Sequence, residues 1–287
     1  MRIAHIIMAH HYPEQLLRLI QRLGHPQSDF YVHLDKKTPI DEFEFIKEKA
    51  EVTFIKNRVK CNWGGNSFLK AIITSLNEVI SLNKEYDFIN LISAQDYPIA
   101  STAYIYDYLK DNLGKNYISF ELSKESDWWQ KAALRYEKYH FTDFNFKSKY
   151  FFEKLINQIL PKRKFPGSLE LYGSSKSSWW TISGECSKYV AQKLTNDKKL
   201  WNFLKYSWGS DEFVITSIIM NSDFKNKVVN DNLRYIDWSE GKARPKILGI
   251  ADFDKIKNSG MIFARKFDSG VDHQVLEKID MDCLNIV

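Results

Sequence analysis

The sequence predicts an α/β protein with a mostly parallel central sheet flanked by helices. Along the first 120 residues, short and nearly continuous apolar runs alternate with longer segments whose apolar residues recur at helical spacing. Such runs are typical of strands that are buried on both faces of a parallel sheet, and the alternation places helices on both faces. The 287 residues, 44% of them hydrophobic, are enough for one large domain with a sizeable core.

Each predicted element follows from its apolar run and from the residues that begin or end it. Pro13 suits the first turn of a helix, and Gly24 suits its end. Ser67 and Ser101 are in position to cap two later helices. The predicted helices begin at residues 13, 41, 67 and 101, and the predicted strands are residues 3–9, 30–34, 52–55, 88–92 and 117–120.

The second half of the chain has a different texture. Residues 127–129 and 135–140 mix aromatic and charged side chains, which suits carbohydrate binding but also an ordinary aromatic-rich surface. Residues 173–183 are predicted as a polar loop that enters a short strand, and residues 186–194 as a helix.

Polar residues follow the predicted strands, at the edge of the sheet where open α/β folds bind ligands. His10 comes after the first strand and is either a phosphate or sugar contact or a structural side chain. Asp35 comes after the second strand and either binds a nucleotide base or ribose or forms a loop ion pair with its neighbouring lysines. Asp96 comes after the fourth strand, where it is either functional or part of a turn.

The stretch Trp63-Gly64-Gly65 precedes the longest predicted helix. It places a flat ring beside flexible backbone, which would let a ligand approach closely, or it forms a turn with a core tryptophan. The chain contains neither a GxGxxG nor a GxxxxGK[ST] motif, so dinucleotide and P-loop sites are not predicted.

Charge and cysteine content narrow the class of protein. The formal net charge of +5 fits a phosphate-bearing ligand or an anionic membrane surface, and no nucleic-acid module is present, so no nucleic acid is expected as a partner. The three cysteines are odd in number and lack CxxC spacing, which favours reduced thiols and a cytoplasmic protein. No apolar run reaches about 18 residues, so no membrane span is expected.

Residues 147–164 are basic and amphipathic. One hypothesis is a segment that docks on anionic lipid beside a lipid-linked acceptor, which would make the protein peripheral at the inner face of the plasma membrane. The alternative is a surface helix whose apolar side is buried against the protein, and the sequence favours this alternative.

The acidic pair Asp211-Glu212 follows a loop of residues 207–210 and precedes an apolar, helical run. An acid favours the N-terminus of a helix, so both carboxylates are explained by a structural role. The residue pattern alone leaves a catalytic role open.

Six stretches, in their order along the chain, resemble one family. They are residues 33–37, 63–67, 91–99, 173–183, 210–213 and 263–268. The order is similar to that of the core-2/I-branching β-1,6-N-acetylglucosaminyltransferases and their peptide O-xylosyltransferase relatives. The membrane anchor, stem and disulfide cysteines of the eukaryotic members have no counterpart here, so the chain looks like a compact bacterial version.

The resemblance implies a GT-A-like fold with an acceptor-side sub-lobe. It implies a single domain over residues 1–287, with a nucleotide-sugar-binding half over 1–120 and an acceptor and catalytic half over 121–287. The implied reaction is an inverting transfer without metal or other cofactor from a UDP-sugar, with UDP-GlcNAc expected first and UDP-xylose next. The implied acceptor is a surface or capsular glycan, free or lipid-linked. The alternatives are a retaining or metal-dependent transferase, and a non-catalytic glycan- or nucleotide-binding protein.

The resemblance also assigns roles residue by residue. Glu212 matches the catalytic base, and Arg244 and Lys266 match the two cations that hold the donor diphosphate. One carboxylate suffices as a base, and two fixed cations can replace a metal. The other assignments place on the donor side His10, Asp35, Trp63, Gly64 and Asp96, and on the acceptor side Glu121, Ser178, Trp179 and Asp211.

Two stretches have the DxD spacing that binds a metal in many GT-A enzymes. They are Asp252-Phe253-Asp254 and Asp280-Met281-Asp282, and both occur late in the chain. They are predicted to be a surface loop and a surface tail, so no metal ligand is expected.

Overall fold

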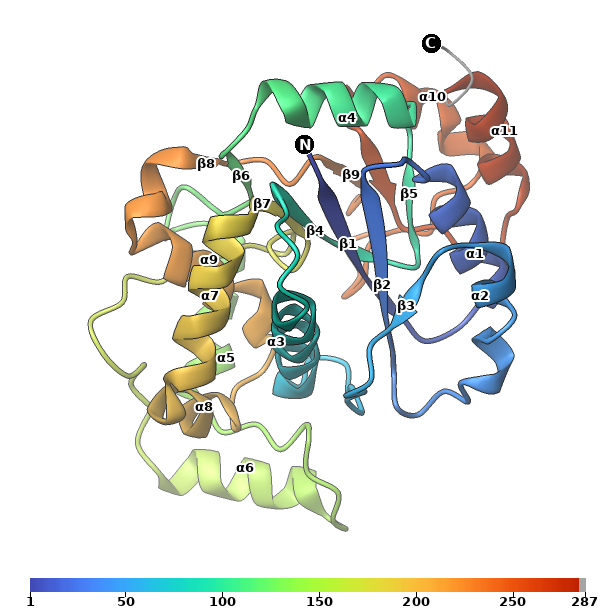
Figure 1. The fold of residues 1–287 in the computed structure, drawn as a ribbon. Helices are drawn as coiled ribbons and strands as arrows, with labels where there is room; N and C mark the ends of the chain where they lie inside the picture. Colours follow the sequence, from blue (N-terminus) through green and yellow to red (C-terminus); the bar gives the residue numbers. More distant parts are fainter. Residues whose placement is uncertain (284–287) are drawn as a thin grey trace.

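The computed structural model describes residues 1–283, which form three layers: a seven-stranded sheet with a layer of helices on each face (Figure 1). The strand order is β3-β2-β1-β4-β7-β6-β8. The pairs β1–β2, β1–β4, β2–β3 and β6–β8 are parallel, whereas β7 runs antiparallel to both of its neighbours. The predicted α/β class with a mostly parallel sheet is confirmed. The strands are β1 (Ile3–Ala9), β2 (Ser28–Leu34), β3 (Thr53–Phe54), β4 (Phe88–Ser93), β6 (Asn116–Tyr117), β7 (Trp180–Ser183) and β8 (Val228–Val229).

Two hydrophobic cores lie on the two faces of this sheet. All seven residues of β1 are buried, and successive side chains alternate between the two cores, as the pleat of a strand requires. One core is covered by α1 (Pro13–Arg22), α4 (Thr102–Asp111), α10 (Phe253–Lys257) and α11 (Gln274–Asp282). The other is covered by α3 (Asn66–Ser81), α7 (Gly184–Asn196), α8 (Lys198–Leu204) and α9 (Val214–Met220).

The helix boundaries confirm one predicted cap and correct another. Ser101 caps α4, because its hydroxyl accepts a hydrogen bond from the Tyr104 N–H at 3.2 Å. Ser67 does not cap α3, which begins at Asn66 with Gly65 at the cap position. The predicted helix over residues 41–50 is split into a 3-10 turn, Asp41–Phe43, and the short α2 (Ile46–Lys49).

A second, three-stranded sheet was not predicted. It consists of β5 (Asp96–Pro98), β10 (Phe263–Arg265) and β9 (Arg234–Ile236), in the order β5-β10-β9. The register pairs Arg265 with Asp96, so segments far apart in the sequence meet at the end of β4. The Asp96 carboxylate is fully buried between Arg234 and Arg265, whose Nε atoms lie 3.5 Å and 3.4 Å from its oxygens.

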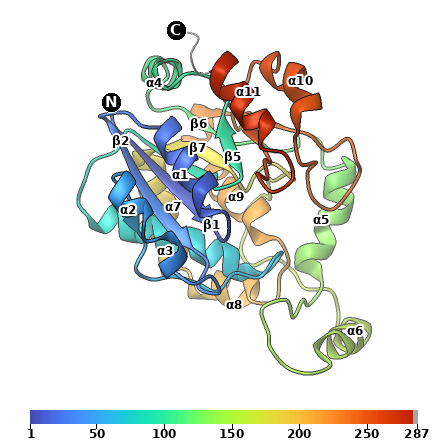
Figure 2. The same ribbon diagram turned by 90° about the vertical axis from the view of Figure 1, so that its right-hand side faces the viewer.

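Helices α5 (Asp127–Glu137) and α6 (Lys149–Ile159) form a sub-lobe beside the main body (Figure 2). Asp143, in the loop between them, fixes the sub-lobe to the start of α3, because its carboxylate accepts hydrogen bonds from the Ser67 N–H, the Ser67 hydroxyl and the Asn62 amide at 2.6–3.0 Å. Among residues 1–283, no helix combines the length and apolarity needed to cross a bilayer.

Candidate active site

The acidic pair lies in a tight loop that leads into α9. Ser210–Glu212 forms a single 3-10 turn, preceded by Gly209 in the left-handed region with φ of 59°. A side chain at position 209 would put a Cβ 2.6 Å from Arg135 Nη1, so only glycine lets Arg135 lie against this backbone. The Gly209 N–H donates to the Gly64 carbonyl at 2.8 Å, which joins this loop to the loop before α3.

The two oxygens of the Glu212 carboxylate have different surroundings. Oε2 accepts hydrogen bonds from Arg135 Nη1 at 2.6 Å and from Trp128 Nε1 at 3.2 Å. Oε1 accepts none from any residue between 1 and 283. Because the side chain is 21% exposed, a ligand can reach it. The carboxylate is therefore held by one oxygen and has the other free to accept a proton.

Burial raises the pKa of Glu212 from 4.5 to about 7, with the Arg135 charge opposing the shift and the Asp211 charge adding to it. A group with this pKa is partly ionised at neutral pH, which suits a general base. The shift also has a thermodynamic cost. The folded state binds this proton more tightly than the unfolded chain, so the stability contributed by the protonated carboxyl is lost as the pH rises from about 4.5 through about 7.

Asp211 has a different role from Glu212. Its Oδ2 accepts a hydrogen bond from the Ser178 hydroxyl at 2.6 Å, both side chains are buried, and burial raises the pKa of the Asp211 carboxyl. It caps neither the turn Ser210–Glu212 nor α9, since neither has a side-chain cap. The expectation that Asp211 caps the helix is therefore wrong, and its hydrogen bond with Ser178 instead joins the Ser210–Glu212 turn to the loop over residues 173–179.

The loop over residues 173–179 carries two residues that are expected to bind the acceptor, Ser178 and Trp179, and it contacts the backbone of Glu212. Its Ser174 N–H donates to the Glu212 carbonyl at 3.2 Å. The Glu121 N–H donates to the Gly173 carbonyl at 3.0 Å. Because Ser174 follows Gly173, the same loop contacts the backbones of both Glu121 and Glu212. At the other end of this loop, Trp179 stacks on the guanidinium of Arg265, at 4.3 Å from the ring centroid.

A chain of aromatic and cationic groups leads away from Glu212. The Arg135 guanidinium lies 4.5 Å from the centroid of the Trp208 ring, and this ring makes an edge contact with Trp63 at 5.2 Å. Arg244 lies over the other tryptophan, Trp63, at 5.4 Å. This chain connects the proposed base to the first of the two proposed diphosphate-binding cations.

The second cation, Lys266, is within electrostatic range of the first. Burial lowers the pKa of Lys266, and the charges of Arg265 and Arg244 lower it further. Neither Arg244 nor Lys266 forms an ion pair with another residue of the described chain. Two unneutralised cations within range of each other repel, and a bound diphosphate would relieve this repulsion.

His10 and Asp35 lie on the same side of the site as Lys266. The pKa of His10 is lowered to about 4, first by burial and then by the charge of His11, and it also responds to Asp35 and Lys266. The Asp35 carboxylate accepts hydrogen bonds from the Lys37 N–H at 2.9 Å and the Cys61 N–H at 3.4 Å, and its other oxygen lies 3.5 Å from Lys37 Nζ. The loop ion pair is therefore present, and a nucleoside contact by Asp35 stays a prediction.

Asp96, which is expected to contact the donor, is not exposed at the site. Because it is fully buried under Arg234 and Arg265, its carboxylate has no surface for a ligand to contact. A direct donor contact by Asp96 is therefore corrected to a supporting role. It holds Arg265, the residue before Lys266, in place.

The two late DxD stretches are also corrected. Asp280 is not in a surface tail, because it is buried and accepts hydrogen bonds from Tyr97, Arg18 and Arg22. Asp252 is likewise buried and pairs with Lys246 at 2.6 Å. Among residues 1–283, no group of three or more His, Cys, Asp or Glu side chains is placed to hold a metal ion.

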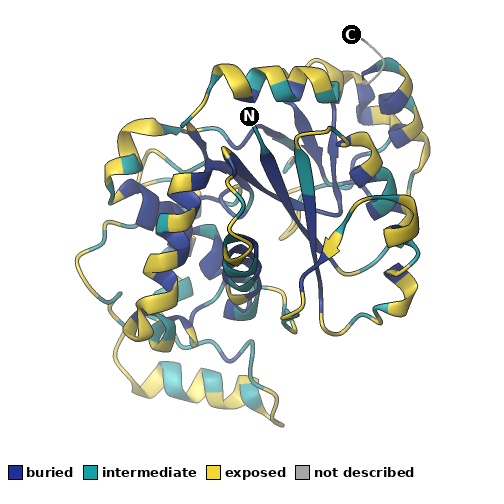
Figure 3. Ribbon diagram, in the orientation of Figure 1, coloured by how far each residue is buried: buried dark blue, intermediate teal, exposed yellow. Residues whose placement is uncertain are grey.

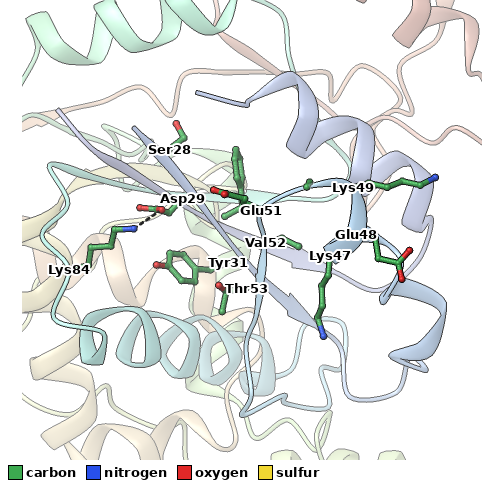
Figure 4. A pocket seen from close by; sticks show the side chains of 12 residues that line it. Ser28, Asp29, Tyr31, Lys47, Glu48, Lys49, Glu51, Val52, Thr53 and Lys84 are labelled. Atoms are coloured by element: carbon green, nitrogen blue, oxygen red, sulfur yellow. Dashed lines mark hydrogen bonds and ion pairs between the residues drawn. The ribbon is translucent and has the colours of Figure 1, made fainter. Parts of the chain in front are cut away.

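A hollow on the surface lies away from this site (Figure 4). It is lined by Ser28, Asp29 and Tyr31 of β2 and by Lys84, among others. Ser28 is at the amino end of β2, whereas His10 and Asp35 follow the carboxyl ends of β1 and β2. The hollow therefore does not contribute to the candidate active site.

Sequence reasoning missed the residues that hold Glu212. Arg135 and Trp128 were noticed only as part of an aromatic and charged stretch, and Trp208 only as part of a loop. Arg135 is 77 residues from Glu212, and no spacing rule connects the two. The one signal in the sequence is the mixture of tryptophans and cations itself, since an arginine side chain packs favourably on the face of a tryptophan ring.

Comparison with known proteins identifies the family. The model of the core-2/I-branching enzyme family matches residues 3–257. The chain therefore belongs to the core-2/I-branching enzyme family, and the resemblance found in the sequence is confirmed.

The curated relatives are xylosyltransferases. A xylosyltransferase of Ciona intestinalis is 22% identical over 97% of this chain, and human xylosyltransferase 2 is 25% identical over 97% of it. These matches cover 34% and 33% of the relatives, so the chain spans about a third of the length of the curated relatives it matches.

Solved structures are more distant. The galactosyltransferase LgtC, in complex with donor and acceptor sugar analogs, aligns over 99% of this chain and 97% of its own, with a TM-score of 0.47 and 9% identity. Mouse xyloside xylosyltransferase 1 in its apo form aligns over 92% of this chain and 97% of its own, with a TM-score of 0.42 and 8% identity.

Substituting Gly64 by alanine tests the close packing of the two loops. Gly64 has a φ of +71°, and its Cβ would overlap the indole nitrogen of Trp208. We expect Gly64→Ala to lower the free energy of unfolding by more than the roughly 1–2 kcal/mol that a left-handed backbone alone costs, and to change tryptophan fluorescence. Gly114→Ala is the matched control, because it has a φ of +79° and open space around its Cβ. Equal losses in urea unfolding of the two variants would show that the contact with Trp208 is unimportant.

Proposed function

We propose that the chain is an inverting, metal-independent glycosyltransferase with a GT-A-like fold, which moves a sugar from a UDP-sugar to a hydroxyl of a glycan acceptor. The observation that carries the proposal is the Glu212 carboxylate, whose Oε2 is fixed by Arg135 and Trp128 while Oε1 is free. Membership in the core-2/I-branching family supports it, as does the position of Arg244 and Lys266 beyond the connecting tryptophans.

The chemistry follows from these positions. Glu212 Oε1 takes the proton of the acceptor hydroxyl while the hydroxyl oxygen forms a bond to C1 of the sugar, on the face opposite the leaving group. The bond from C1 to the phosphate oxygen breaks, and UDP leaves with its electron pair. Arg244 offers a planar fork of donors and Lys266 a point charge to the phosphate oxygens, which stabilises the developing negative charge.

The donor sugar has two candidates. UDP-GlcNAc is expected from the N-acetylglucosaminyltransferases of the family. UDP-xylose is the second candidate, because the curated relatives are named as xylosyltransferases. Glu121, Ser178, Trp179 and Asp211 are proposed to shape the acceptor side, and His10, Asp35, Trp63 and Gly64 the donor side.

The acceptor is proposed to be a growing surface or capsular glycan, free or lipid-linked. This places the protein in the cytoplasm, with peripheral contact through residues 147–164 at the inner face of the plasma membrane. No nucleic acid takes part. The alternative hypothesis is a non-catalytic protein that binds glycans or nucleotides. It predicts binding without turnover of any UDP-sugar.

Release of UDP from a panel of UDP-sugars is the experiment that tests the function. Glu212→Gln should lower kcat by about 10²–10⁴, the contribution of a general base, while UDP still binds. Arg244→Ala and Lys266→Ala should each weaken donor binding, and Glu185→Gln, an exposed acid in the first turn of α7, is the control that should change neither. EDTA should leave the rate unchanged. Loss of turnover in EDTA would contradict the metal-free reaction, and full turnover by the Glu212 variant would remove the proposed base.

The pH dependence of turnover tests the environment of Glu212. Activity should rise with pH through the pKa of Glu212, because only the carboxylate accepts a proton. Arg135→Gln removes the charge that lowers this pKa, so the acid limb of the profile should move to higher pH. Asp211→Asn removes a charge that raises it, so the limb should move to lower pH. Measured as kcat from about pH 5 to about pH 9, shifts in the same direction for both variants would show that another group controls the limb.

A further inference from the structure

Helix α6 turns its polar side toward the protein. The Asn157 side chain exchanges two hydrogen bonds with the backbone of Tyr139, at 2.7 and 2.8 Å, and Glu153 accepts one from the Phe141 N–H at 2.7 Å. Lys149 donates to two carbonyls of the same loop at 3.1 and 3.2 Å. These three side chains are four residues apart, so they form one stripe along the helix.

The opposite side of α6 is apolar and faces solvent. No residue of the helix is buried, as Figure 3 shows. Four large side chains share the outer face, with exposed fractions of 64% for Phe151, 46% for Phe152, 38% for Leu155 and 69% for Ile159. The prediction that this helix buries its apolar side is therefore wrong, because the loop before α6 provides hydrogen-bond partners for the polar side. An exposed apolar patch of this kind marks an interaction surface.

Positive charge is concentrated in the segment that carries this apolar face. Residues 147–164 contain six lysines or arginines and one acid, an excess of five that equals the net charge of the whole chain. Lys147, Lys154 and Lys164 are exposed, and none forms an ion pair within residues 1–283. Lys162 pairs with Glu137. A second copy of the chain would bring this positive charge against itself, whereas an anionic surface would neutralise it.

We propose that the outer face of α6 is a docking surface for an anionic lipid bilayer. Phe151, Phe152, Leu155 and Ile159 enter the boundary between headgroups and acyl chains, and the three free lysines lie at the level of the lipid phosphates. This is the arrangement of an amphipathic helix that lies in the membrane interface, and each lysine near an anionic leaflet adds to the attraction.

The docking surface is fixed to the catalytic loop. Arg163, which follows α6, donates to the carbonyls of Tyr206 at 2.7 Å and of Phe203. The His140 N–H also donates to the Tyr206 carbonyl at 2.9 Å. Tyr206 directly precedes the loop that ends in Glu212, so a bilayer in contact with α6 would lie at a set position relative to the site. This part of the inference rests on the proposed function, since the bilayer would present a lipid-linked acceptor.

Flotation with phosphatidylcholine vesicles, with and without phosphatidylglycerol, tests the docking. The wild-type chain should float with the anionic vesicles and bind the neutral ones at least about tenfold more weakly. Phe151→Ser/Ile159→Ser should reduce the bound fraction on anionic vesicles at least about tenfold, because most of the inserted apolar area is lost. The matched control, Leu113→Ser/Val271→Ser, removes two similarly exposed apolar side chains elsewhere and should bind like the wild type.

A second pair of variants tests the charge. Reversal of the three free lysines to glutamate should also abolish flotation with anionic vesicles, whereas reversal of three exposed lysines elsewhere, Lys110, Lys225 and Lys227, should weaken it much less. Circular dichroism confirms that each variant is folded.

Three outcomes would overturn the proposal. The first is no flotation of the wild type with either vesicle. The second is equal binding by the wild type and Phe151→Ser/Ile159→Ser. The third is a dimer in analytical ultracentrifugation that these substitutions dissociate, without any vesicle binding, which would assign the face to a second copy. Flotation does not depend on turnover, so its failure is separate from a failure of the proposed reaction, which UDP release measures in the absence of lipid.

Discussion

The ion pair between Arg135 and Glu212, 2.6 Å long and partly buried, is the contact on which the rest of the site depends. Without a cation beside it, the pKa of this carboxyl would be higher still, because burial raises the pKa and the Arg135 charge opposes that shift. Arg135 is itself held between the rings of Trp128 and Trp208, and it needs Gly209 to approach the loop. The sub-lobe that carries Arg135 is in turn tied to α3 through Asp143, so the base is positioned by contacts between distant parts of the chain.

Each end of the site keeps polar groups that have no bonding partner among residues 1–283. At one end, Glu212 has a free oxygen and a pKa near 7, and at the other, Arg244 and Lys266 repel each other without an ion-pair partner in residues 1–283. Such an arrangement costs stability in the free protein. In the proposed reaction, the acceptor hydroxyl would donate to the free oxygen of Glu212 and the donor diphosphate would contact the two cations. The buried residues Asp96, Arg234 and Arg265 support the cationic end of the site, because their contacts fix β10, the strand that leads into Lys266.

Elements with a periodic local signal could be predicted from the sequence, and contacts between distant segments could not. The apolar run over residues 3–9 predicts both ends of β1 correctly, and local chemistry is enough to predict the cap at Ser101. Strands β5, β9 and β10 have only three residues each, too few for a pattern, and they form only because they pair with one another. Ser67 does not cap α3, because the carboxylate of Asp143, 76 residues away, accepts the hydrogen bond of the Ser67 N–H in the first turn of that helix. In α6, periodicity identified the two faces but not which one faces the protein, since this depends on the loop that packs against it. The roles of Glu212, Arg244 and Lys266 came from the order of the family motifs.

A crystal structure of the Glu212→Gln variant with an intact UDP-sugar tests the central claim most directly, because it shows both ends of the site at once. The account predicts that the diphosphate contacts Arg244 and Lys266, and that the side chain at position 212, held by Arg135 and Trp128, faces C1 of the sugar from the side opposite the diphosphate. A diphosphate bound away from these two cations, or a side chain at position 212 on the same side of C1 as the leaving group, would contradict it.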